Sequence, residues 1–308
     1  MKRYLLILVL GLFLVGCSQT DTTTSGRFIG GTTGLELGFV EGEPPLVVGD
    51  NNEDEFDIGI IAKNQGEADI EAGKMIVTLQ GIEKDAFSLS SLSQRTTTKI
   101  EKRSKIREKV TEPDQIEVRF KNAKYKYDLD SDFPQDLRAD VCYEYQTKAV
   151  GDLCLKKKPN SQGDEDQCEL SNEAMSIENS GAPVSIVSMS QIPRSTSIKL
   201  TFDIMVQGDG VVYAPGTFSS ECGLNDELED KIRVKLSGVG DLSIKCARLG
   251  DSNDGLVELI GGARTISCDI DTASLQETAF KKPLNIELTY FYKDTIATSF
   301  TVENTDFT

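Results

Sequence analysis

Short segments in which apolar residues occupy every second position most constrain how this 308-residue chain can fold. Successive side chains of a β-strand point to opposite faces, so this spacing predicts strands with one buried face. Such segments recur from Leu35 onward, and no segment has the apolar spacing of an amphipathic helix longer than two turns. We therefore predict an all-β chain folded as sandwiches of antiparallel sheets. The clearest run contains Leu284, Ile286, Leu288, Tyr290 and Tyr292.

One alternating segment occurs twice, and this predicts an internal repeat. The first copy runs into Gln65-Gly66 and the second into Gln207-Gly208, with an offset of 142 residues. A strand with one buried face that leads into the same turn in both halves suggests two copies of one sandwich. The apolar residues of the two copies are Phe56, Ile58, Ile60 and Ala62, and Ile198, Leu200, Phe202 and Ile204.

A polar stretch between the two copies predicts where they separate. Residues 156–167 contain charged residues, Pro and Gly but no apolar residue. We therefore predict a first sandwich over 35–158, a linker over 159–167 and a second sandwich over 168–308. Within the second sandwich, we expect the chain to turn at Lys293-Asp294 and to end in a hairpin.

The first seventeen residues have the pattern of an export signal. Lys2 and Arg3 precede an apolar stretch at 4–15, which is shorter than the ~20 residues that a spanning helix needs. The following tetrapeptide, Leu14-Val15-Gly16-Cys17, resembles the lipobox of prokaryotic lipoproteins. That resemblance implies a signal peptide over 1–16, cleavage before Cys17, and a covalent lipid on the Cys17 thiol.

Anchoring through this lipid would place the chain at the cell membrane, facing outside the cytoplasm. Residues 17–34 are rich in Ser, Thr and Gly, and we expect them to form a flexible tether after the lipidated cysteine. Membrane lipid is therefore the first expected partner.

The six cysteines after Cys17 are an even number in a chain expected to be exported, which predicts disulfides. A hairpin that turns near residues 148–151 would bring Cys142 opposite Cys154, and we predict that pair. Cys168 is expected to pair with Cys222, the nearest cysteine left without a partner. Cys246 and Cys268 each share a strand face with apolar residues, which predicts a buried disulfide between strands.

Composition excludes several classes of function. The chain contains no histidine, which is the usual general base near neutral pH, and no tryptophan. Its net charge is -17, and losing Lys2 and Arg3 with the signal takes it to −19. Such a charge disfavours nucleic acid, and it should repel an anionic membrane surface. No nucleophile motif or phosphate-binding loop is present, so we expect no enzyme.

Calcium is the one cofactor that the sequence suggests besides the lipid. Asp128, Asp130 and Asp132 alternate within a predicted turn, and carboxylate oxygens are the ligands that Ca²⁺ prefers. However, Phe133 stands where a calcium-binding loop of the EF-hand type needs glycine. A solvated acidic turn is the alternative interpretation.

The segment 45–81 is similar to the immunoglobulin-like, adhesion-type modules of bacterial and archaeal surface proteins. Asn64, Gln65, Gly66 and Ala68 carry this resemblance, and the second copy departs from it by lacking the asparagine. Residues 142–154 resemble a hairpin of archaeal lipoproteins. These similarities imply two tandem immunoglobulin-like β-sandwiches on a surface lipoprotein, and they bring no catalytic residues.

These observations favour a non-catalytic protein-interaction or structural role in the cell envelope, with an envelope protein as partner. One alternative is a module that binds carbohydrate or another ligand, assisted by calcium. For that alternative Tyr143 and Tyr145 would be binding platforms, although strand packing is the simpler role for both. A solute-binding component associated with a transporter is the third.

Overall fold

The computed structural model describes residues 26–107, 109–160, 168, 170, 174–216, 222 and 226–307. The described chain is all-β, as predicted, and its only helices are three short 3₁₀ turns. Within these residues, no helix has the length and apolar character needed to cross a membrane. Cys17 and the predicted signal peptide lie outside the described residues.

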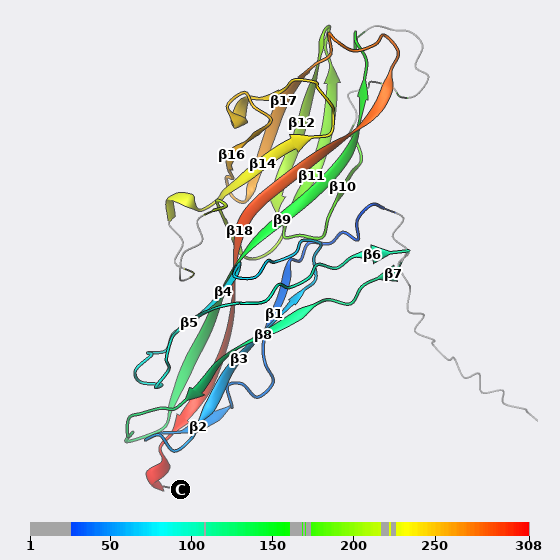
Figure 1. The fold of residues 1–308 in the computed structure, drawn as a ribbon. Coiled ribbons are helices and arrows are strands. Elements are labelled where there is room, and N and C mark those ends of the chain that lie inside the picture. Colours follow the sequence, from blue (N-terminus) through cyan, green and yellow to red (C-terminus); the bar gives the residue numbers. More distant parts are fainter. Residues whose placement is uncertain are drawn as a thin grey trace, which may run out of the picture.

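Two very long strands, β9 (Phe133–Leu155) and β18 (Phe280–Glu303), form the axis of the molecule. They pair antiparallel from Leu155↔Phe280 to Phe133↔Val302 without a register shift, over all 23 residues of β9. At ~3.3 Å per residue, this ribbon is ~75 Å long. It passes through an upper and a lower lobe in Figure 1 and belongs to both.

The N-terminal lobe, the lower one in Figure 1, contains the 133–142 part of β9 and the 293–303 part of β18. A three-stranded sheet in the order β1-β3-β8 forms one layer, and the ribbon with β4 and β5 forms the other. The C-terminus lies at the far end of this lobe (Figure 1). Its other strands are β1 (Leu35–Phe39), β2 (Val47–Gly49), β3 (Phe56–Asn64), β4 (Met75–Gln80), β5 (Ser93–Arg95), β6 (Lys105–Ile106), β7 (Lys109–Val110) and β8 (Gln115–Ala123).

The C-terminal lobe contains the 148–155 part of β9 and the 280–287 part of β18. A four-stranded sheet in the order β11-β12-β17-β15 faces the ribbon, which β14 and β16 extend. The other elements of this lobe are β10 (Ile177–Asn179), β11 (Val184–Pro193), β12 (Ser197–Val206), β13 (Val211–Tyr213), η1 (Asp226–Leu228), β14 (Lys231–Ser237), β15 (Ile244–Cys246), η2 (Ala247–Leu249), β16 (Asp254–Glu258) and β17 (Ala263–Asp271). After β18, η3 (Thr305–Phe307) ends the described chain at the far end of the N-terminal lobe (Figure 1).

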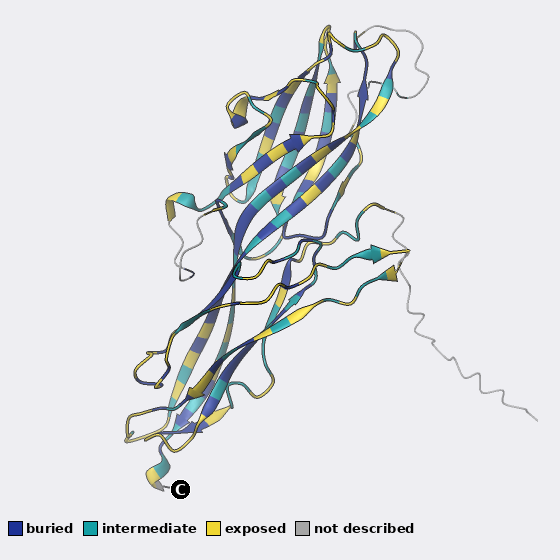
Figure 2. Cartoon of the chain, viewed as in Figure 1, coloured by how far each residue is buried: buried dark blue, intermediate teal, exposed yellow. Residues whose placement is uncertain are grey.

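The sequence repeat corresponds to a repeated arrangement. β3 lies between β1 and β8 in one lobe, and β12 lies between β11 and β17 in the other. The two Gln-Gly turns also have the same hydrogen-bonding pattern, in which two successive backbone amides donate to one carbonyl. The amides of Gln65 and Gly66 donate to the Gly34 carbonyl at 2.9 and 3.1 Å. Those of Gln207 and Gly208 donate to the Pro183 carbonyl at 2.7 and 3.3 Å. Buried and exposed residues alternate along the strands, as Figure 2 shows.

The two predicted turns inside the long strands are wrong. Gly151 was expected to help the chain turn, but β9 continues through it. A side chain there would lie 2.0 Å from the Met189 methyl group, so this glycine lets β11 approach β9 closely. Lys293-Asp294 likewise continues β18. As a result, the nine-stranded sheet combines strands from both sides of the predicted domain boundary. That boundary stays a prediction, and residues 161–167 of its linker lie outside the described residues.

The structure confirms three disulfides but corrects two of the pairings. Cys246 pairs with Cys268 as predicted, on adjacent residues of β15 and β17. Cys142, however, pairs with Cys222, and Cys154 with Cys168. Because β9 is one continuous strand, Cys142 and Cys154 lie ~40 Å apart along it and cannot meet. Three disulfides indicate an oxidising environment outside the cytoplasm.

Candidate functional site: the joint between the lobes

The ribbon connects the two lobes at a short segment that we call the joint, residues 143–147 of β9 and 288–292 of β18. Its inner face carries four tyrosines, at most 2% exposed, because every second residue of a strand points to the same side. Neighbouring rings have centroids 5.6 to 6.5 Å apart, the spacing of edge-on aromatic contacts. These tyrosines are Tyr143, Tyr145, Tyr290 and Tyr292. Tyr143 and Tyr145 are therefore packing residues and not exposed ligand platforms.

The tyrosine hydroxyls bond to both lobes. In the N-terminal lobe, the Leu35 amide donates to Tyr143 Oη at 3.3 Å, and Tyr145 Oη donates to Asn64 Oδ1 at 3.1 Å. In the C-terminal lobe, the Gly210 amide donates to Tyr292 Oη at 2.7 Å. The Tyr290 hydroxyl lies 3.0 Å from Thr147 Oγ1, which donates to the Val184 carbonyl at 2.6 Å. Each lobe is thus bonded to the ribbon through buried hydroxyls, which fixes its orientation.

The two repeated glycines fit closely against these hydroxyls. A side chain at Gly66 would place its Cβ 2.0 Å from Tyr145 Oη and 2.6 Å from the Gly181 carbonyl. At Gly208, the Cβ would lie 2.2 Å from Tyr292 Oη. The sequence repeat marked both positions as turns, but their role at the joint depends on tyrosines far away in the chain.

Residues 26–34 belong to the folded body and not, as predicted, to a flexible tether. The Glu67 carboxylate accepts the amides of Ile29, Gly30 and Gly181 at 3.0, 2.9 and 2.7 Å. Composition suggested flexibility because this stretch has few apolar side chains, yet its backbone amides are bound by a carboxylate of another segment. The remaining part of the predicted tether, 17–25, lies outside the described residues.

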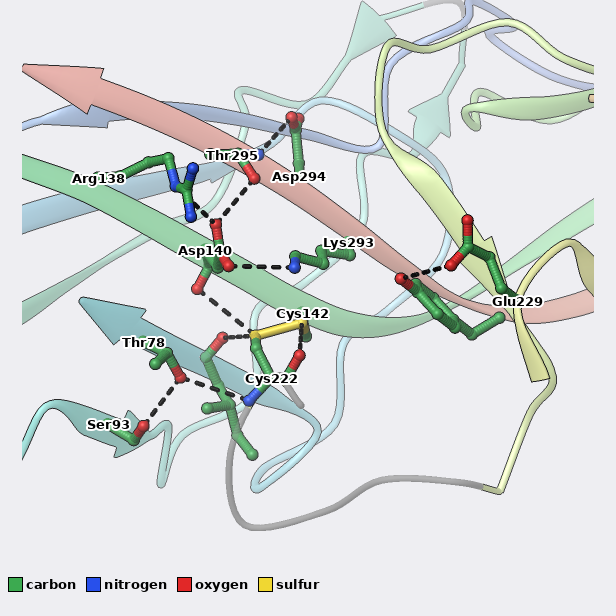
Figure 3. Close-up of polar contacts among 12 residues, drawn as sticks. Thr78, Ser93, Arg138, Asp140, Cys142, Cys222, Glu229, Lys293, Asp294 and Thr295 are labelled. Atoms are coloured by element: carbon green, nitrogen blue, oxygen red, sulfur yellow. Dashed lines mark hydrogen bonds and ion pairs between the residues drawn. A yellow bond between two sulfur atoms is a disulfide. The ribbon is translucent and has the colours of Figure 1, made fainter. Parts of the chain in front are cut away.

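The Cys142–Cys222 disulfide lies on the other face of β9, next to a buried acid (Figure 3). Asp140 is 5% exposed and lies 3.1 Å from Lys293 Nζ across the ribbon. It also accepts a hydrogen bond from Thr295 Oγ1 at 2.9 Å. The Cys222 amide donates to Thr78 Oγ1 of β4 at 3.4 Å. The disulfide therefore fixes a residue from the C-terminal half of the sequence to the N-terminal lobe.

The predicted calcium ligands lie in the loop before β9, far from the joint. Asp128, Asp130 and Asp132 are all exposed, and Asp132 accepts the Asn304 amide at 2.8 Å. The described part of the chain has no group of three acidic, His or Cys side chains arranged to hold a metal ion. Calcium binding stays a prediction without support from this geometry.

A residue that the sequence analysis missed organises this loop. Asp50 is 1% exposed and accepts hydrogen bonds from Thr305 Oγ1 and the Leu129 amide, both at 2.7 Å. The Thr305 bond is the main reason that the pKa of Asp50 is lowered from its usual value. No spacing pattern connects residues so far apart, so this role of Asp50 could not be predicted from the sequence.

The joint tyrosines should resist ionisation. Burial raises the pKa of Tyr292 to about 12, and burial likewise raises the pKa values of Tyr143, Tyr145 and Tyr290. A folded-state pKa above the unfolded value of ~10 gives stability that is complete below pH ~10 and lost as pH rises through the folded value. We therefore expect alkaline unfolding between pH 10 and 12, with these phenols ionising only as the protein unfolds. Absorbance at 295 nm, followed together with circular dichroism, measures this, and reversible ionisation of every tyrosine near pH 10 in the folded protein would contradict it.

Comparison with known proteins identifies no family for this chain. The chain matches no protein-family model, and no curated protein sequence matches it either.

Proposed function

We propose that this chain is a membrane-anchored, extracytoplasmic lipoprotein with a non-catalytic interaction or structural role in the cell envelope. The observation that carries the proposal is the uninterrupted ribbon through both lobes, because it makes the body a stiff, elongated unit. A body of this kind holds binding surfaces at a fixed separation. The three disulfides agree with an exported protein, and the absence of histidine agrees with a non-catalytic role.

The place where the chain leaves the folded body would determine which part of the body lies near the membrane. Residues 29 and 30 are bound to Glu67 at the joint. A lipid on Cys17 would then be twelve residues from this contact, and twelve residues span at most ~43 Å when fully extended. The middle of the rod, and not one of its ends, would be held near the membrane. The high negative charge would keep its surface from adhering to anionic lipid.

Detergent partition tests the anchor. We expect the full chain, expressed in cells that process lipoproteins, to enter the Triton X-114 phase, and the Cys17→Ala variant to remain in the aqueous phase. Intact mass should show the diacylglycerol on residue 17 as the new N-terminus. If both proteins partition into water and the mass shows no lipid, the anchor is wrong.

Photo-crosslinking tests the partner. A photoreactive amino acid at Leu46, which is 83% exposed in the N-terminal lobe, or at Ile260, 70% exposed in the C-terminal lobe, samples both lobes. We expect at least one position to give a discrete protein adduct in intact cells, and Cys17→Ala to weaken it. The absence of adducts at both lobes would contradict an interaction role.

A further inference from the structure

A cavity of about 330 Å³ lies on the C-terminal lobe, where the chain passes from one sheet to the other. β16 is the edge strand of the nine-stranded sheet, and a tight turn at 259–262 leads from it to β17 of the four-stranded sheet. Side chains from β14, η2, β16 and β17 line the cavity. They are Lys231, Arg248, Leu256, Val257, Glu258 and Arg264.

The charge of this cavity is opposite to that of the protein. Three cationic side chains face a single acid, Glu258, in a chain of net charge -17. In the described residues, Arg248 and Arg264 form no ion pair, whereas Arg233, on the same strand as Lys231, pairs with Asp254 at 2.8 Å. Four further arginines of the described chain, Arg27, Arg119, Arg138 and Arg194, also pair with a carboxylate.

Arg264 gives the more specific indication that this cavity binds an anion. Its Nε is buried and has no hydrogen-bond partner, and it is the only such side-chain nitrogen or oxygen in the described part of the chain. A buried donor without an acceptor is costly, so native proteins usually provide it with a partner, an ordered water or an ion. A guanidinium presents its donors as a rigid fork that fits the two oxygens of a carboxylate or phosphate.

We propose that this cavity binds an oxyanion carried by a small organic molecule, such as a sugar acid. Arg264 would donate to the anionic oxygens, and Lys231 and Arg248 would add positive charge around them. The cavity is far larger than one inorganic ion, and its size is near the lower limit of known ligand sites. Leu256, 48% exposed at its wall, offers an apolar surface to the rest of the ligand. Binding at this cavity does not require the membrane anchor.

Nuclear magnetic resonance of the arginine Nε–Hε groups tests the proposal on the folded, oxidised chain. Titration with glucuronate should shift the Arg264 signal and saturate, while neutral glucose should leave it unchanged. Arg264→Gln should weaken glucuronate binding at least tenfold, measured by calorimetry. Arg248→Gln, a change at an exposed position, should weaken it less. Arg233→Gln is the matched control and should leave affinity unchanged.

Inorganic phosphate forms the second arm of the experiment. Saturable binding of glucuronate, tighter than that of phosphate, supports an organic oxyanion. Binding of phosphate alone would overturn the organic part of the proposal. Absence of saturable binding with either anion, or an equal loss of affinity in the Arg264→Gln and Arg233→Gln variants, would overturn the site.

Discussion

Replacing Gly66 with alanine is expected to destabilise the protein by about 3 kcal/mol, because the joint has no space for a methyl group. The new Cβ would meet Tyr145 Oη at 2.0 Å and the carbonyl oxygens of Gly181 and Thr33 at 2.6 and 2.9 Å. Two of these atoms belong to the backbone and the third to a buried ring, so none can move away cheaply. Urea unfolding measures the loss, and a thermal midpoint lower by roughly 6 to 12 °C should accompany it.

Gly38→Ala is the matched control for this prediction. Gly38 lies in β1 of the same lobe, and a Cβ there would meet only the Ile61 methyl group at 3.6 Å, an ordinary contact. We expect its stability to change by less than ~0.5 kcal/mol. Equal stabilities of the Gly66→Ala and Gly38→Ala variants would show that the joint is not closely packed.

Removing the Cys142–Cys222 disulfide should cost about 4.5 kcal/mol, because it closes the longest of the three disulfide loops among the described residues. Its cysteines are 80 residues apart, whereas Cys154 and Cys168 are 14 apart. In the chain-entropy view, a longer loop removes more freedom from the unfolded state, and about 3 kcal/mol is expected for the shorter one. Urea unfolding of the Cys142→Ala/Cys222→Ala double variant gives the value.

The comparison with Cys154→Ala/Cys168→Ala makes this second prediction specific. Both variants lose one disulfide, but only the first loses the covalent bond between the N-terminal lobe and a residue of the C-terminal half. We expect the first to be the less stable variant. A larger loss from the Cys154→Ala/Cys168→Ala change would contradict the assignment. Peptide mapping without reduction tests the pairings themselves.

The strands were predictable from sequence because their signal is local. Alternation of apolar residues gave β3, β12 and the inner face of β18, and the repeat gave the two Gln-Gly turns. Continuity of the long strands was not predictable, since Gly151 serves equally well in a turn or where Met189 approaches a strand. The disulfide error followed directly, because cysteine pairing depends on which strands are neighbours and not on spacing.

The candidate sites were less predictable than the strands, for a related reason. The alternation of apolar residues in the sequence predicted that the tyrosines of the joint share a strand face with other apolar side chains. The hydrogen-bond partners of their hydroxyl groups, however, come from distant segments. Arg264 looks like any other arginine of the chain, and only the folded structure shows that its Nε is buried without an acceptor. Such information depends on tertiary contacts that no local pattern encodes.

Hydrogen exchange at the joint tests the central claim that β9 and β18 form one continuous ribbon through both lobes. If they do, the amides of residues 143–147 and 288–292 should exchange as slowly as those of β3 and β12 inside the lobes, because all open only with global unfolding. Mass spectrometry of the oxidised protein measures this directly. Exchange at the joint that is orders of magnitude faster than in β3 and β12 would show two domains on a flexible connection and would contradict the account.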